Sequence, residues 1–229
     1  MTIQDMQNLN RDTISYITSV IQPGMTLCKI RTLCEEYMLS HGADSFWYWD
    51  VGAFVFCGED TVLSVSGRQY TTADTVIEPD DIITIDLSPQ HNSVWGDYAR
   101  TIIIEAGIAV TDTSKICNDQ WREGLLMEAK LHKAMRSFVC QDTTFEELFY
   151  YINDMIRENG YMNLDFLGNL GHSIVSDKNQ RIYIEKGNQT KLSEVDAFTF
   201  EPHICLLGGK YGYKMENIYA FQNERLVEL

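Results

Sequence analysis

The chain is poor in basic residues: 18 Lys and Arg stand against 33 Asp and Glu, so its 229 residues carry a formal net charge of −15. Sequence-independent binding to nucleic acid needs a basic face, which this composition does not favour. The same deficit argues against docking on an anionic membrane surface. We therefore expect no nucleic-acid partner and no membrane partner. The excess carboxylates should either form a solvated acidic surface or hold cations.

The sequence also lacks long apolar stretches and recognisable targeting segments. No apolar run approaches the roughly 20 residues that cross a bilayer. The first residues, MTIQDMQNLNRD, contain neither the basic region nor the apolar region of a secretory signal. The six cysteines are scattered and form no C-x-x-C pair. In a chain of this length that distribution is typical of reduced core cysteines, so we expect a cytoplasmic protein.

Only four prolines interrupt the chain, and long patterned segments lie between them. Hydrophobic residues at helical spacing, together with threonine caps and glycine stops, predict helices over 3–21, 26–42, 113–138 and 144–160. Runs rich in β-branched and aromatic residues predict strands over 51–57, 61–66, 82–88, 95–105, 181–184, 197–206 and 211–221. Two helices followed by strands, twice over, indicate an α+β fold with helices on one side of a mainly antiparallel sheet.

One short pattern occurs in both parts of the chain. The segment DIITID at 81–86 is echoed by DAFTFE at 196–201, and each follows a helix that begins at a threonine cap. Each segment places an acid at the end of a strand. We therefore predict a single domain, 1–229, made of two related halves at about 1–110 and 111–229.

Acidic residues face each other in the predicted hairpin of the first half. A turn centred on His91 and Asn92 would place Asp86 opposite Asp97. Directly opposed residues hold their Cβ atoms about 4.5–5.5 Å apart. Like charges this close repel each other, and burial among apolar strands disfavours both anions. The pair therefore needs either protons or a cation.

A second pair of acids is predicted in the other half. The Gly-Gly pair at 208–209 is a strong hairpin signal and would place Glu201 opposite Glu216. Four carboxylates neutralise two divalent ions. With one imidazole added, the donor set suits Mn, Fe, Co or Zn better than Ca or Mg. The alternative is that these acids are exposed at strand ends and are unrelated.

Five residues match the metal-ligand pattern of one known family in order and in spacing. They are Asp86 in IDL, Asp97 in GDYART, His172 in LGHSI, Glu201 in FTFEP and Glu216 in YKMEN. Over roughly residues 5–225 the chain resembles the methionine aminopeptidase, prolidase and creatinase family. The resemblance implies the pita-bread fold, in which pseudo-twofold halves carry helices outside a curved, mainly antiparallel sheet. It covers the catalytic unit, without the extra N-terminal domain of prolidases and creatinases.

The same resemblance implies an enzyme with two divalent metal ions, Mn, Fe, Co or Zn. Asp97, His172 and Glu201 would bind one ion, Asp86 would bind the other, and Asp97 and Glu216 would help to bridge them. Water between two such ions ionises near neutral pH, and Glu201 would take its proton. We therefore predict a dinuclear metallohydrolase of a small amide or a peptide N-terminus. It would resemble an aminopeptidase or Xaa-Pro dipeptidase with altered specificity.

The chain departs from the family pattern at two histidines and one arginine. The family histidine before the first metal strand corresponds to residues 64–66, which read Ser-Val-Ser. The histidine seven residues after His172 is replaced by Asn179. The arginine before the last ligand is Lys214, which exchanges a planar fork for a point charge. We expect Val65, Asn179 and Lys214 to contribute to substrate binding.

Three further residues are candidates for the pocket. His203 follows the E-P pair where the family commonly has glycine, and alternation places it on the same side of the strand as Glu201. It would supply a missing imidazole, as a donor or an extra ligand, unless it only packs. Trp47 and Trp49 lie where the family builds part of its substrate pocket, and aromatic walls suit flat or apolar groups. Ordinary core packing is their alternative.

Two other functions stay open for this sequence. One is a metalloenzyme of the same fold with redox chemistry on a small metabolite, which the missing histidines favour. The other is a binding module without catalysis, against which the intact ligands count. In each enzymatic reading the partner is a small-molecule or peptide substrate. Aromatic side chains on the surface of the protein would also be compatible with a homodimer.

Overall fold

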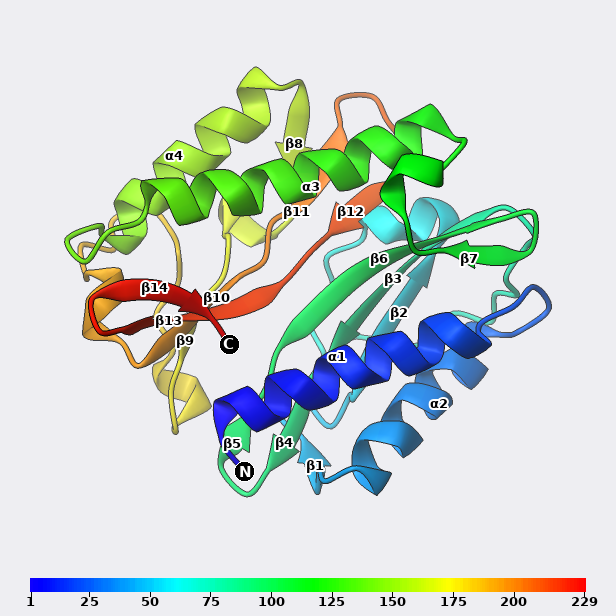
Figure 1. Cartoon of the computed structure of the whole chain (residues 1–229), viewed down its shortest axis with the longest axis horizontal. Helices are drawn as coiled ribbons and strands as arrows, with labels where there is room; N and C mark the ends of the chain where they lie inside the picture. Colours follow the sequence, from blue (N-terminus) through cyan, green and yellow to red (C-terminus); the bar gives the residue numbers. More distant parts are fainter.

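The computed structural model describes all 229 residues. Two helices, α1 (Ile3–Val20) and α2 (Leu27–Ser40), lie on one side of a layer of strands. The helices α3 (Asp119–Phe138) and α4 (Phe145–Glu158) lie on the other side (Figure 1). Every paired strand is antiparallel to its neighbour. The α+β class predicted from the sequence is confirmed. The division into two halves stays a prediction.

Side-chain caps explain where the helices begin. Thr26 accepts a hydrogen bond from a backbone N–H in the first turn of α2, and Thr144 forms a reciprocal capping box with Glu147 at α4. The third helix begins later than predicted, because residues 113–115 form a separate short 3-10 turn. The side chain of Asn118 then caps α3 through the backbone N–H of Trp121.

Four small sheets carry the strands. Their orders are β2-β3-β6-β7, β14-β13-β10-β9, β12-β11-β8 and β1-β4-β5. The strands of the first half are β1 (Ser45–Phe46), β2 (Ala53–Cys57), β3 (Asp81–Leu87), β4 (Pro89–His91), β5 (Val94–Trp95), β6 (Tyr98–Glu105) and β7 (Ile108–Val110). Those of the second half are β8 (Tyr161–Asn163), β9 (Ser173–Ile174), β10 (Ala197–Phe200), β11 (His203–Leu206), β12 (Gly212–Lys214), β13 (Asn217–Gln222) and β14 (Arg225–Glu228).

Two predicted strands are absent, and three are broken in two. Residues 58–62 form a 3-10 helix followed by a loop, and residues 181–184 form a loop with one bridge from Tyr183 to His172. The predicted strands 95–105, 197–206 and 211–221 each stop and restart within two or three residues. Local β-propensity cannot reveal these breaks, because they depend on which partner takes each backbone group.

The two predicted hairpin registers had different outcomes. Asp86 lies opposite Ala99 and not opposite Asp97, so the first register was wrong by two residues. The turn is formed one step later than predicted, since Asn92 adopts a positive φ of 57° and His91 pairs with Val94. In the second hairpin the pairs on either side of Glu201 have the predicted register.

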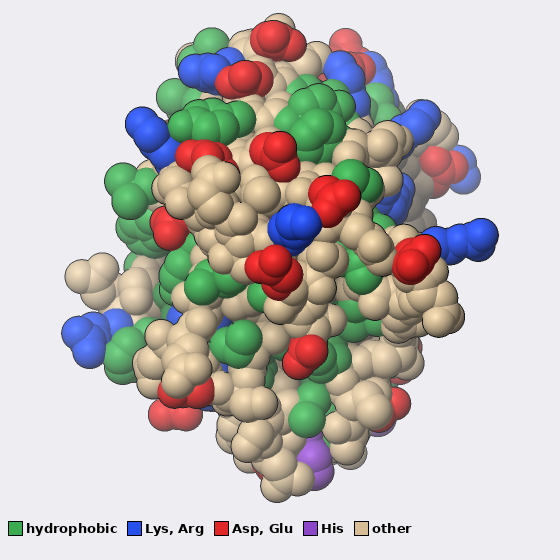
Figure 2. All heavy atoms as spheres, turned by 90° about the vertical axis from the view of Figure 1, so that its left-hand side faces the viewer, with side chains coloured by type: hydrophobic (Ala, Val, Ile, Leu, Met, Phe, Trp, Pro, Cys, Tyr) green, Lys and Arg blue, Asp and Glu red, His purple; other side chains and the backbone are tan.

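A separate hydrophobic core lies beneath each pair of helices. Met6, Ile30 and Ile85 belong to the core under α1 and α2, and Leu148 and Phe198 belong to the core under α3 and α4. Full burial of such a side chain contributes about 1.5–3 kcal/mol. None of the helices is both long enough and apolar enough to cross a membrane. On the face shown in Figure 2, acidic and basic side chains are interspersed, and this face carries no extended basic patch.

Candidate metal centre

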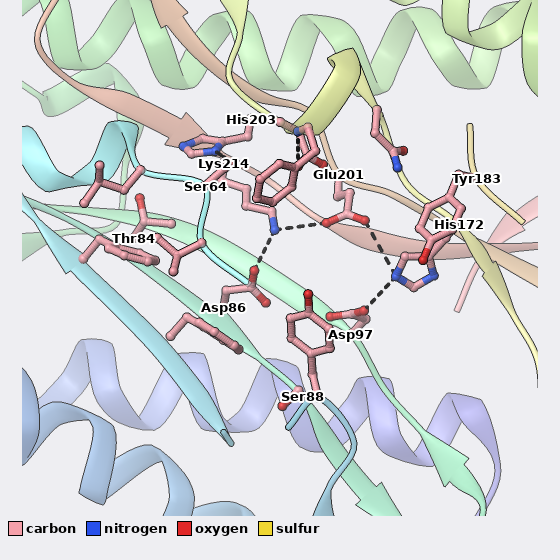
Figure 3. Close-up of a pocket in the computed structure, with 18 of the residues that line it drawn as sticks. Ser64, Thr84, Asp86, Ser88, Asp97, His172, Tyr183, Glu201, His203 and Lys214 are labelled. Carbon is pink, nitrogen blue, oxygen red and sulfur yellow. Dashed lines mark hydrogen bonds and ion pairs between the residues drawn. The ribbon is translucent and has the colours of Figure 1, made fainter. Parts of the chain in front are cut away.

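Three of the five predicted ligands lie where a strand is interrupted. Asp97 lies between β5 and β6, Glu201 between β10 and β11, and Glu216 between β12 and β13. At an interruption a side chain is freed from the alternation of the sheet. Asp86 lies within β3, and His172 directly precedes β9. Figure 3 shows the side chains of the labelled acids and His172 converging on one pocket.

Backbone contacts between the two halves bring Glu216 to Asp97. The N–H of Glu216 donates to the carbonyl of Ala99, at 3.0 Å. The Arg100 guanidinium donates to the carbonyl of Glu216 at 2.7 Å and to Oδ1 of Asn217 at 2.6 Å. The strand β6, which begins directly after Asp97, therefore also fixes the backbone of Glu216.

Polar residues on α1 hold the backbone of Asp97. Its N–H donates to Oε1 of Gln7 at 3.3 Å, and Nδ2 of Asn10 donates to the same oxygen at 2.9 Å. Gln7 and Asn10 are completely buried. On the other side, Nε1 of Trp47 donates to the carbonyl of Gly96 at 2.9 Å. Buried polar groups at a strand break fix its geometry when they are paired in this way.

His172 is oriented so that Nε2 faces the acids. Its backbone exchanges hydrogen bonds with Thr199, through Oγ1 at 2.9 Å and through N–H at 2.8 Å. Its Nδ1 donates to the carbonyl of Ser173 at 3.2 Å, which fixes the tautomer and leaves a lone pair on Nε2. Nε2 lies 3.4 Å from Oδ2 of Asp97 and 3.8 Å from Oε1 of Glu201.

These residues fit a divalent cation. One carboxylate oxygen each from Asp86, Asp97 and Glu216 lies within 4.8 Å of the others. Both carboxyl oxygens of Glu216 are buried and have no hydrogen-bond partner. An unpaired buried carboxylate is costly, and buried charges are normally paired or bound to metal. Ligands about 2.1 Å from a common ion lie roughly 3–3.5 Å apart, which is close to the separation of His172 and Asp97.

Lys214 points into the acidic cluster and not toward free space in the pocket. Its Nζ lies 2.6 Å from Oδ2 of Asp86, 3.0 Å from Oε2 of Glu201 and 3.8 Å from Oε2 of Glu216. Its position does not favour the predicted contribution of Lys214 to substrate binding, which stays a prediction. Its ammonium group already forms ion pairs with three protein carboxylates.

The pKa values within the cluster show how strongly its charges interact. Burial raises the pKa of Asp97 to about 7, although the neighbouring His172 acts in the opposite direction. Burial, followed by the charges of Asp97 and Glu201, raises the pKa of Glu216 well above its usual value. Burial also acts on Glu201, but the Lys214 ammonium outweighs it and lowers that pKa. Without a cation the cluster holds protons, and a cation would displace them.

The centre opens into a pocket of about 370 Å³. This volume suits a small molecule or a short peptide segment. Nine of its 23 lining residues are hydrophobic, and among them are Trp47, Tyr48, Phe54, Phe56, Val65 and Tyr183. Trp47 and Val65 thus lie where the sequence predicts a substrate, and the Trp47 ring meets His172 edge-on at 5.8 Å.

Two predicted substrate residues lie outside this pocket. Trp49 is 53% exposed, because a positive φ of 58° turns the chain outward, and its ring lies under the guanidinium of Arg68. Asn179 is exposed on a short 3-10 turn, where its side chain bonds to Asp177. Neither residue lines the pocket, and a role in substrate binding stays a prediction for both. In an irregular loop the side chains of adjacent residues point in different directions. The spacing of these residues relative to the family motifs therefore does not show whether their side chains face the pocket.

His203 reaches the pocket as predicted, but its ring is not free. Its Nε2 donates to the carbonyl of Thr61 at 2.7 Å, and its Nδ1 lies 3.2 Å from Oγ of Ser64. Burial lowers the pKa of His203 to about 4, so the ring is neutral. The geometry does not support an extra metal ligand. It places the imidazole beside the segment where the family histidine is absent, and a catalytic role stays a prediction.

Sequence reasoning missed several residues that build the site. Gln7 and Arg100 position ligands through the backbone, and Asp165 and Arg181 line the pocket. Gln7 gives some signal, because it is a polar residue on the apolar face of a predicted helix. Nothing in the sequence pattern around Arg100, Asp165 and Arg181 indicates that they contribute to the site.

An α+β fold with strands between two pairs of helices, and with carboxylates and a histidine gathered in one pocket, is typical of metallohydrolases. Residues 2–223 match the model of metallopeptidase family M24, and the chain belongs to this family. The fold is accordingly the pita-bread fold. Metal dependence is a property that the family implies.

Three similar proteins illustrate the likeness. Methionine aminopeptidase of Helicobacter pylori is 24% identical over 215 residues, covering 88% of this chain and 78% of its own. Xaa-Pro dipeptidase of Lactobacillus helveticus is 26% identical over 132 residues, 58% of this chain and 33% of its own. The crystal structure of X-Pro aminopeptidase from Thermotoga maritima superposes with a TM-score of 0.80 at 22% identity, covering 99% of this chain and 59% of its own. This chain thus spans well under two thirds of two of them.

Proposed function

We propose that the chain is a metal-dependent hydrolase that cleaves a small amide or a peptide N-terminus with two divalent ions. The observation that carries the proposal is the carboxyl group of Glu216, which is completely buried without a hydrogen-bond partner and lies beside Asp86 and Asp97. Such a group needs either a proton or a cation, and here two further carboxylates are close enough to share the cation. A binding module without catalysis has no need of this arrangement.

Charge favours two ions over one. When Asp86, Asp97, Glu201 and Glu216 are all ionised and Lys214 is protonated, the cluster has a net charge of −3. One divalent ion leaves it negative, whereas two ions leave one positive charge, which a bound hydroxide would neutralise. Asp97, His172 and Glu201 would hold one ion, Asp86 would hold the other, and Asp97 and Glu216 would help to bridge them.

The chemistry follows from the residues around the ions. Divalent ions held by these residues would acidify water and polarise a carbonyl group. Glu201 would accept the proton of that water, because Lys214 keeps the carboxyl group ionised. Lys214 also holds Asp86 in place through the 2.6 Å ion pair. Hydrolysis of an amide then yields a carboxylic acid and an amine.

The substrate class is supported by the pocket and by the relatives. The pocket volume and aromatic walls suit a compact molecule. The relatives named Xaa-Pro dipeptidase and methionine aminopeptidase point to peptide ends. Serine at residue 64 and the displacement of Asn179 from the pocket support a specificity different from theirs. A homodimer stays a prediction, which analytical ultracentrifugation would check.

The deciding experiment measures metal content per chain after gentle purification. We expect about two ions in the wild type, because two divalent cations together with a bound hydroxide balance the cluster's net charge of −3. Asp97→Ala should lose most of them, whereas Asp119→Ala, an exposed aspartate on α3, should retain them. A wild type that contains no metal, and whose melting is unchanged by Mn, Fe, Co or Zn, would contradict the proposal.

A second candidate is a non-hydrolytic, redox reaction on a small metabolite at the same metal centre. One observation favours it: His172 and His203 are the only imidazoles that line the pocket, and both are engaged. A panel of X-Pro dipeptides and N-terminal peptides separates the two functions. Turnover of any member supports hydrolysis. Metal binding without turnover, accompanied by oxygen uptake on a metabolite panel, supports the second function.

A further inference from the structure

The helix α3 contacts the segment that carries two residues of the acidic cluster. It lies across β11 and β12 (Figure 1), and none of its residues lines the pocket. His132 on this helix is 2% exposed. Its Nε2 lies 3.0 Å from the carbonyl oxygen of Met215, the residue between Lys214 and Glu216. Since a carbonyl can only accept, Nε2 carries the proton and donates it.

The other ring nitrogen of His132 is also engaged. Nδ1 lies 2.9 Å from the hydroxyl oxygen of Tyr219. Burial lowers the pKa of His132 to about 3, so the ring is neutral and Nδ1 accepts from that hydroxyl. Glu228, at 3.3 Å, is the more distant acceptor for the same hydroxyl. Two hydrogen bonds therefore fix both the tautomer and the orientation of the imidazole.

The peptide group between Met215 and Glu216 is thus held at both ends. Its N–H, which belongs to Glu216, donates to the carbonyl of Ala99 at 3.0 Å. Its carbonyl, which belongs to Met215, accepts from His132. In a planar trans peptide the N–H and the C=O point in opposite directions, so partners at both ends fix the plane. That plane sets the direction in which the Cα–Cβ bond of Glu216 leaves the backbone.

This direction matters because no hydrogen bond holds the side chain of Glu216. Both of its carboxyl oxygens are buried without a hydrogen-bond partner, and the Lys214 ammonium lies 3.8 Å from Oε2. Without the His132 ring, the Met215 carbonyl would lose its partner, and the peptide would be free to tilt toward another. Such a tilt would move the Glu216 carboxylate relative to the other acids.

We propose that His132 is a positioning residue of the metal centre and orients the Glu216 carboxylate from a helix outside the pocket. It acts through the backbone and touches neither the ions nor the substrate. Groups that orient a metal ligand through hydrogen bonds contribute about 10–100-fold to metal affinity. The inference rests on the proposed function, because it requires ions at this centre.

Metal binding measured without turnover tests this inference. The full-length chain is stripped of metal with a chelator, freed of the chelator and titrated with Mn²⁺ by calorimetry. His132→Phe keeps an aromatic ring but lacks the donor, and we expect it to bind Mn²⁺ about 10–100-fold more weakly than the wild type. His132→Gln places an amide N–H near the position of Nε2 and should recover part of the affinity. If His132→Phe does not fold, His132→Asn replaces it, because its shorter side chain does not reach the carbonyl.

Met135→Ala is the matched control for loss of stability. Met135 is completely buried on the same helix, so its truncation lowers the melting temperature without removing a hydrogen bond from the 215–216 peptide. This variant should bind Mn²⁺ like the wild type. Wild-type affinity in His132→Phe, or an equal loss of affinity in Met135→Ala, overturns the inference and leaves the metal centre standing. A wild type that binds no Mn²⁺ overturns the proposed metal centre and this inference together.

Discussion

Glu128 on α3 is a single residue with a measurable effect on stability. It is completely buried, and neither carboxyl oxygen has a partner. Burial raises its pKa well above the usual value, so the folded chain keeps a proton that the unfolded chain releases. Stability should therefore fall as the pH rises above the ordinary carboxyl pKa, toward the raised folded value.

Replacing this carboxyl by a group that does not titrate should remove that loss. We expect Glu128→Gln to gain stability relative to the wild type between pH 5 and pH 8, as measured by the melting temperature at each pH. Glu123→Gln, an exposed glutamate on the same helix, is the control and should show no such trend. Parallel curves for Glu128→Gln and the wild type would contradict the raised pKa.

His203 is the second residue that carries a prediction. Its ring lies beside Ser64 in the pocket wall and contacts none of the predicted metal ligands through a hydrogen bond. We expect His203→Ala to lose turnover by about 10²-fold or more, the usual contribution of a positioned imidazole. Its metal content should remain that of the wild type. Unchanged turnover would show that the ring only packs.

At the scale of elements, the short connection into β9 sets the position of His172. Gly171 has a φ of 136°, and a Cβ there would overlap the carbonyl oxygen of Thr199. Gly171→Ala should therefore cost about 1–3 kcal/mol of unfolding free energy and weaken metal binding. Urea unfolding and metal analysis measure the two effects.

Gly187 supplies the matched control for that strand connection. It also has a positive φ, 90°, but nothing lies within 4 Å of an added Cβ. Gly187→Ala should thus show only the backbone strain and keep the metal content. If both variants lost the same unfolding free energy and the same amount of metal, the contact between residue 171 and Thr199 would not matter for stability or metal binding.

At the scale of the whole molecule, the candidate metal centre combines residues from the two predicted halves of the chain. Asp86 and Asp97 come from the first half, and His172, Glu201 and Glu216 come from the second. A cation that binds only the folded chain stabilises it by about 2.7 kcal/mol at a hundredfold excess over Kd, which raises the melting temperature by about 5–10 °C in a chain of this size. Calorimetry with and without Mn, Fe, Co or Zn measures this shift, and Asp97→Ala should abolish it. An equal shift in both proteins would place the cation elsewhere.

The helices and most strands can be read from the amino-acid sequence alone. The pattern of the five predicted ligands can also be read there, and their role stays a prediction. Helix caps such as Thr144, and the turn at 208–209, act over a few residues, so a single chain displays them. The short motifs that contain Asp86, Asp97 and His172 can also be recognised within a few residues.

How those residues meet depends on contacts between segments that are distant in the chain. The strand breaks at Asp97 and Glu216 arise because backbone groups find partners elsewhere, on α1 for Asp97 and on β6 for Glu216. The place of Lys214 among the carboxylates and the hydrogen bond from His132 to Met215 depend in the same way on distant segments. Electrostatic and packing partners of this kind are fixed by the folded chain as a whole, and no local pattern in the sequence records them.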